Sequence, residues 1–232
     1  MNTKQKKPIS KLVFLALIFI ISVSFSYWGI QMYKFIAGTK NNAKENIVNI
    51  QNDSLQNGDI IFQTSKSRQS MAIQIATKSE YSHVGIIYLI SGKYMVFEAV
   101  QPVKLTPLNE WINRGKNGKY VIKRLNDEFN LNQENLAKMK EIGNSYVNKD
   151  YDLYFNWSDE KMYCSELVWK IYKFGANIEI GKLQQLKDFD LSNKEVKKVL
   201  KKRYGDNIPL EETVISPVSI FNCEKLKTIA QN

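Results

Sequence analysis

The sequence predicts an α+β domain in which an antiparallel sheet packs against several helices. Two apolar, β-branched runs at 84–90 and 94–100 flank the polar segment 91–93, which is the pattern of a β-hairpin. Residues 164–174 instead place their large apolar side chains at helical spacing. Because no internal repeat or low-complexity block interrupts these patterns, we expect one folded domain of ordinary globular type.

The other elements of the domain are each predicted by a local pattern. Gly175 directly follows the apolar repeat of 164–174, and we expect it to end that helix in a left-handed conformation. In chain order the predicted elements are a turn and short buried strand at 58–62, a helix at 67–77, the hairpin with His83 opening its first strand and Glu98 late in its second, a helix at 107–114, a strand at 120–125, and helices at 134–147 and 164–174.

The net charge of +10 is concentrated near the amino terminus. Residues 1–45 hold seven Lys and one Glu, which leaves 26 basic and 22 acidic residues in the rest of the chain. This small excess does not predict nucleic-acid binding, which requires a basic face or stripe. The basic segment 194–204 has apolar residues at helical spacing and predicts an amphipathic surface helix, with contact to an anionic polymer or lipid as the alternative.

The amino-terminal segment predicts attachment to a membrane. Twenty-two residues without a charge separate Lys11 from Lys34, enough for a helix to cross a bilayer, and Tyr27 and Trp28 suit its interface. We therefore expect an uncleaved anchor and a domain outside the cytoplasm; the alternative is a cleaved signal and a secreted or periplasmic domain. The predicted organisation is a basic cytoplasmic tail at 1–11, the anchor or signal segment at 12–36, a polar linker at 37–56 and the folded domain at 57–232.

Three residues predict thiol chemistry. Cys164 begins a predicted helix, where the N–H groups and the helix dipole favour a thiolate and can bind an oxyanion. His83 is the only histidine and therefore the only candidate imidazole base. Glu98 lies on the adjacent strand, within reach of His83 if the two share a face of the hairpin. The residues alone leave open a packed histidine, an exposed Glu98 and a disulfide between Cys164 and Cys223.

The motifs around these residues resemble the YiiX-like, circularly permuted NlpC/P60 papain-like cysteine hydrolases. The resemblance covers about residues 55–225 and depends on several motifs that occur in the family's order. They are NGDIIF at 57–62, YSHVGI at 81–86, FEA at 97–99, YCSELVW at 163–169 and ISP at 215–217.

The resemblance implies a permuted papain-like core with Cys164 as nucleophile, His83 as base and Glu98 orienting the histidine. It disfavours the disulfide, because oxidation would remove the nucleophile. Tyr163 and Tyr154 belong to an aromatic cluster before the cysteine and are candidate substrate-binding residues, with core packing as the alternative. No metal-ligand spacing or phosphate-binding glycine loop is present in the sequence, so we expect no metal and no cofactor.

The predicted function is therefore hydrolysis of amide bonds by a thiol-dependent enzyme outside the cytoplasm. Cell-wall peptides are the first expected substrate class. The first alternative is an amidase or acyltransferase that acts on a lipid or N-acyl amino acid amide at the membrane. The second is a non-catalytic module that binds wall or lipid. The fold alone does not choose between these functions.

Overall fold

The computed structural model describes residues 55–232. The predicted tail, the anchor and all but the end of the linker lie outside these residues. Within 55–232, no helix has both the length and the apolar character that crossing a bilayer requires.

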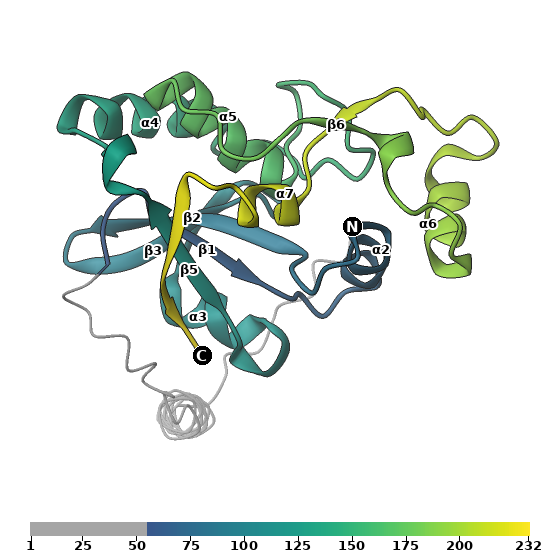
Figure 1. Ribbon diagram of the computed structural model, residues 1–232, viewed down its shortest axis with the longest axis horizontal. Coiled ribbons are helices and arrows are strands. Elements are labelled where there is room, and N and C mark those ends of the chain that lie inside the picture. The colour runs from purple at the N-terminus through teal and green to yellow at the C-terminus, as the bar shows by residue number, and fades with distance from the viewer. Residues whose placement is uncertain (1–54) are drawn as a thin grey trace, which may run out of the picture. The chain divides into compact units, whose positions relative to one another are not determined.

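The core of the described chain is a six-stranded antiparallel sheet with strand order β4-β3-β2-β1-β5-β8 (Figure 1). The strands are β1 (Ile60–Gln63), β2 (His83–Ile90), β3 (Lys93–Glu98), β4 (Lys104–Pro107), β5 (Val121–Leu125) and β8 (Leu226–Gln231). A separate two-stranded sheet pairs β6 (Gln184–Gln185) with β7 (Thr213–Val214).

The predicted hairpin forms β2 and β3 and sets the register of the site. Ile86 pairs with Phe97, so the same register places Glu98 opposite Gly85, two residues from His83 on the same face. A side chain at Gly85 would collide with Val96 Cγ1, 2.4 Å from the position of its Cβ. Glycine at this position therefore leaves the face between His83 and Glu98 open.

Helices cover both faces of the sheet (Figure 1). On one face, α5 (Cys164–Ala176) packs on β2 and against α4 (Gln133–Tyr146); α3 (Leu108–Arg114) lies on the other face, beside β3 and β4. The remaining helices are α2 (Arg68–Thr77), α6 (Lys194–Tyr204), α7 (Pro217–Phe221) and the 3-10 turns Lys116–Gly118, Asp127–Phe129 and Leu186–Asp188.

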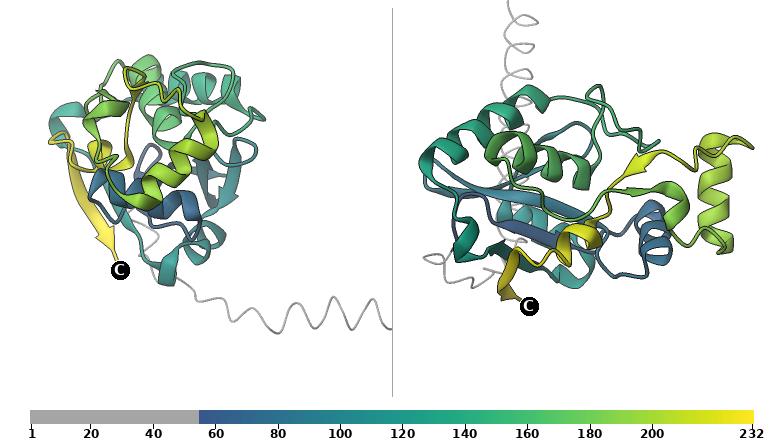
Figure 2. Two further views of the ribbon diagram at one scale, coloured as in Figure 1. Left: turned by 90° about the vertical axis from the view of Figure 1, so that its right-hand side faces the viewer. Right: turned by 45° about the horizontal axis from the view of Figure 1, so that its top comes forward.

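Helix α6 packs against α2 and forms a second, smaller core at the side of the main one (Figure 2). Val196 and Leu200 are buried in this core, as the amphipathic pattern predicts. Five lysines of the helix face solvent: Lys194, Lys197, Lys198, Lys201 and Lys202.

The structure corrects the predicted end of α5. Gly175 does not stop this helix, which continues to Ala176 and is capped by Asn177 in the left-handed conformation at φ 54°. Gly175 is instead a packing residue, because a Cβ there would lie 2.5 Å from the Cα of Met139 on α4. The predicted elements otherwise form within a few residues of the expected bounds, whereas β4, β8, α7 and the small sheet were not predicted.

Candidate active site

Cys164 is the first residue of α5 and is almost completely buried, with 2% of its surface exposed. Its Sγ lies 4.0 Å from the carbonyl oxygen of Ser82, the residue before His83. Ser165 Oγ donates a hydrogen bond to the carbonyl oxygen of Ile215 at 2.7 Å, which links the start of the helix to the segment before α7. Both cysteines are free thiols, so the disulfide alternative does not hold in this structure.

His83 lies at the start of β2 and interacts with Glu98, Trp111 and Cys164. Its Nε2 is 2.6 Å from Glu98 Oε2, and its ring stacks on Trp111 with the ring centres 5.7 Å apart. An ionised carboxylate only accepts hydrogen bonds, so Nε2 carries the hydrogen in this pair. Nδ1 is therefore the nitrogen left to interact with Cys164, whose neighbourhood raises the pKa of His83.

Glu98 is fully buried, contrary to the alternative of an exposed strand carboxylate. Its oxygens also accept hydrogen bonds from three residues that sequence reasoning did not single out. These are Thr106 Oγ1 at 2.6 Å, Trp111 Nε1 at 2.9 Å and Arg114, whose NH2 lies 2.6 and 2.5 Å from the two carboxylate oxygens. The spacing of Trp111 and Arg114, three apart on one helix, was the available signal.

These contacts favour the charged forms of both His83 and Glu98. Burial alone would lower the pKa of His83, but hydrogen bonds and charge interactions with Cys164 and Glu98 raise it to about 9. Burial alone would raise the pKa of Glu98, but hydrogen bonds from His83, Arg114 and Thr106 lower it to about 2. The arrangement therefore holds His83 as an imidazolium between Glu98 and Cys164 at neutral pH.

Glu166, in the first turn of α5, has a structural environment. Its Oε2 lies 3.4 Å from the backbone nitrogen of Tyr163, and its Oε1 lies 2.8 Å from Lys170 Nζ, which is itself buried. Burial raises the pKa of Glu166 to about 7, although Lys170 opposes the rise. These contacts hold Glu166 at the start of its own helix, away from the His83–Glu98 pair.

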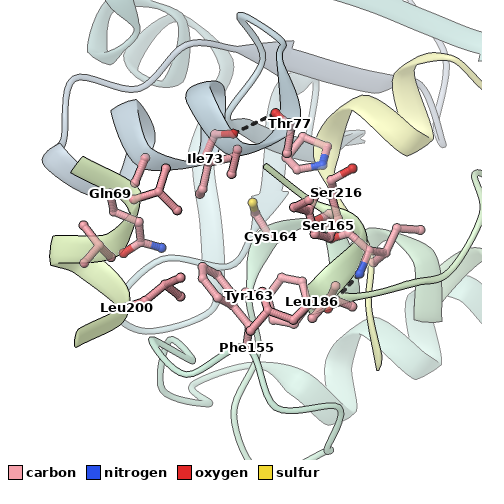
Figure 3. Close-up of a pocket in the computed structure, with 18 of the residues that line it drawn as sticks. Gln69, Ile73, Thr77, Phe155, Tyr163, Cys164, Ser165, Leu186, Leu200 and Ser216 are labelled. Carbon is pink, nitrogen blue, oxygen red and sulfur yellow. Dashed lines mark hydrogen bonds between the residues drawn. The ribbon is translucent and has the colours of Figure 1, made fainter. Parts of the chain in front are cut away.

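A cavity opens beside Cys164 between α2 and α6 (Figure 3). In Figure 3 the sulfur faces it between Gln69 and Ile73 of α2 on one side and Phe155 on the other. The two predicted substrate-binding residues differ in their positions. Tyr163 is buried and lines the cavity, whereas Tyr154 is 45% exposed and does not line it. Tyr151 of the same aromatic cluster takes that place and accepts a hydrogen bond from Gln69 Nε2 at 3.0 Å.

The amino-acid sequence matches a known family over most of its length. Residues 54–230 match the family described as permuted papain-like amidase enzyme, YaeF/YiiX, C92 family. The chain belongs to the permuted papain-like amidases. It is thus a cysteine hydrolase by family, and the predicted YiiX-like family is confirmed.

Two relatives show how far the similarity of this amidase extends. An uncharacterized YiiX protein of Escherichia coli strain K12 is 50% identical over 176 residues, which cover 76% of this chain and 86% of the relative. The crystal structure of a protein described as metalloprotein yiiX, from Escherichia coli O157:H7, is 51% identical with a TM-score of 0.73. That match covers 76% of this chain and 97% of the crystallised one.

The described residues of this amidase lack a set of ligands for a metal ion. Among residues 55–232, no three His, Cys, Asp or Glu side chains are placed together so that they could hold a metal ion. His83 lies between Cys164 and Glu98 and already interacts with both. The donor set does not fit a metal site, and we derive no step through one.

Proposed function

We propose that the chain hydrolyses amide bonds through a thioester on Cys164, with His83 transferring protons and Glu98 orienting His83. The proposal rests on the interacting side chains of Cys164, His83 and Glu98, which meet at the start of α5. A buried, fully bonded Glu98 holds His83 in one tautomer, and His83 interacts with a thiol at a helix N-terminus. This is the arrangement of nucleophile, base and orienting group that acyl transfer requires.

The reaction proceeds in two balanced steps. The Cys164 thiolate attacks the amide carbonyl carbon, the C–N bond breaks, and the leaving amine takes a proton from the His83 imidazolium. A water molecule then attacks the thioester, His83 accepts a proton from it, and the C–S bond breaks to release the carboxylic acid and regenerate the thiolate beside the imidazolium. The backbone N–H of Cys164, which has no partner within its own helix, is suited to bind the oxyanion of both intermediates.

We propose that the enzyme acts outside the cytoplasm, attached by the apolar amino-terminal segment. The 22 uncharged residues between Lys11 and Lys34 support this placement. Two substrate classes are compatible with it, cell-wall peptides and acyl amides of the membrane. The apolar cavity beside Cys164 favours the second.

The test is hydrolysis by the purified full chain, under reducing conditions, of isolated cell wall and of a panel of lipid and N-acyl amino acid amides. Cys164→Ala and His83→Ala should each abolish turnover of whichever substrate is cleaved. Cys223→Ala is the matched control, because it removes a thiol that lies outside the site.

A loss of activity on substitution of Cys164 and His83, with Cys223→Ala unaffected, supports the proposed residues. Turnover that survives Cys164→Ala would refute the nucleophile, and turnover that survives His83→Ala would refute the base. Binding of substrates without any turnover would favour the non-catalytic alternative.

A further inference from the structure

The cavity beside Cys164 is almost wholly apolar and encloses about 730 Å³ between atoms, part of it open to solvent. A predominantly apolar lining is typical of small-molecule sites. One wall is α2, which contributes Ala72, Ile73 and Ala76, and the opposite wall is α6, which contributes Val199 and Leu200. Cys164 and Ser165 lie at its floor.

The depth of Cys164 restricts what can reach it. The residue is 2% exposed, and the apolar cavity is the space that its thiol borders. A substrate carbonyl must therefore approach with part of the substrate inserted between α2 and α6. A slender aliphatic chain fits an apolar, enclosed space of this kind, whereas the polar sugar and peptide groups of a cell wall would lose water there without compensating partners.

Among the side chains that the structure describes, Arg203 is the charged one that lines this cavity. Its guanidinium lies 5.0 Å from the centre of the Phe155 ring, and it is partly buried. Among residues 55–232, no carboxylate lies within ion-pair distance of it. Burial lowers the pKa of Arg203, as expected of a cation that lacks a bonded counter-charge.

The neighbours of Arg203 place it near the reacting centre. The Phe155 ring under it packs edge-on against Tyr163, the residue before Cys164, with ring centres 5.2 Å apart. Tyr151, which also lines the cavity, interacts electrostatically with both Cys164 and Arg203. A single substrate can therefore place its carbonyl group at Cys164 and an anionic group at Arg203.

We propose that the substrate is an anionic N-acyl amide, whose aliphatic chain fills the cavity between α2 and α6 and whose amine portion carries an anion that binds Arg203. The aliphatic chain of the substrate contacts the apolar walls of the cavity, so the amine portion is the part of the substrate that carries the charge. This inference rests on the proposed thioester mechanism and names the substrate class for it.

The experiment measures kcat/KM of the full chain for two matched series, N-acyl glycines and the corresponding N-acyl glycinamides, with acetyl, octanoyl and dodecanoyl chains. The two series differ only in the carboxylate. We expect kcat/KM to rise with chain length, by up to about fourfold for each added methylene. We expect the glycines to be cleaved at least about 10-fold faster than the glycinamides.

Two variants separate the parts of the site. Arg203→Gln should abolish the preference for the glycines over the glycinamides, whereas Lys202→Gln, at an exposed cation beside it on α6, should leave that preference unchanged. Val199→Phe should lower kcat/KM for the long chains more than for acetyl, because Val199 lines the cavity but is only partly buried and tolerates a larger side chain.

The outcomes distinguish failure of this inference from failure of the mechanism. Turnover that depends on Cys164 but shows no chain-length effect and no carboxylate preference would refute the proposed substrate class alone. The same holds if Arg203→Gln and Lys202→Gln have equal effects. Turnover that does not depend on Cys164 would refute the thioester mechanism and with it this inference.

Discussion

Glu98 keeps a full negative charge in the interior because several donors bond to its two oxygens. Such a carboxylate fixes the histidine through Nε2 and leaves Nδ1 for the thiol. We expect Glu98→Gln to lower kcat/KM by about 100-fold or more, because the amide no longer stabilises the imidazolium. The alkaline limb of the pH profile should move to lower pH, since the raised pKa of His83 depends in part on Glu98.

The measurement is the pH dependence of kcat/KM for the wild type and Glu98→Gln. Glu166→Gln is the matched control, because Glu166 is also a buried glutamate near Cys164 but bonds to the helix start. An unchanged alkaline limb in Glu98→Gln would contradict the orienting role.

The sequence predicted the pairing of His83 with Glu98 because hairpin geometry depends on local patterns. Residues 84–90 and 94–100 set the register, and the register sets which side chains share a face. The partners Thr106, Trp111 and Arg114 could not be predicted, because their approach depends on how β4 and α3 fold back over the sheet. Tyr154, predicted to bind substrate, lies outside the cavity lining, since a cluster pattern does not tell which aromatic side chain turns inward.

At the scale of elements, α5 positions Cys164, and its contact with α4 depends on Gly175. Helix propensity alone predicts that Gly175→Ala would stabilise α5 by about 1 kcal/mol. The structure predicts the opposite sign, a destabilisation of about 1–3 kcal/mol, because the new Cβ would collide with the backbone of Met139.

Urea unfolding of the wild type and Gly175→Ala measures this difference. Gly118→Ala at an open position with φ 66° is the control for the loss of glycine, and it should show only the cost of a left-handed alanine. A higher midpoint for Gly175→Ala would contradict the close packing of α4 and α5.

Sequence analysis missed strands β4 and β8 for the same physical reason. β4 and β8 are the edge strands of the sheet, and most of their side chains are partly or fully exposed. Edge strands need no continuous apolar run, so β4 can contain Lys104 and Pro107 and still pair with β3. Helix α6 was predictable because its buried stripe is formed by its own sequence.

At the scale of the whole molecule, the buried His83–Glu98 pair links folding to pH. The pKa of Glu98 falls from 4.5 unfolded to about 2 folded, so its contribution is present above pH 4.5 and is lost as pH falls towards 2. The pKa of His83 rises from 6.5 to about 9, so its contribution is present below pH 6.5 and is lost as pH rises through 9. The pair therefore contributes most between about pH 4.5 and 6.5.

The free energy of unfolding across this range, measured for the wild type and for His83→Ala, tests the linkage. We expect the difference between the two proteins to be largest inside the window and to shrink on the alkaline side. A difference that grows as pH rises through 9 would show that the folded protein holds His83 neutral.

The central claim is that His83 activates Cys164 as a nucleophile. The most direct measurement is the rate of alkylation of each cysteine by iodoacetamide at about pH 6, where an ordinary thiol of pKa about 8.5 is scarcely ionised. Cys223, partly buried and outside the site, is the internal reference. We predict that Cys164 reacts much faster than Cys223 in the wild type and loses that advantage in His83→Ala, while Cys223 is unchanged. Equal rates for both cysteines, or a fast Cys164 in His83→Ala, would contradict the claim.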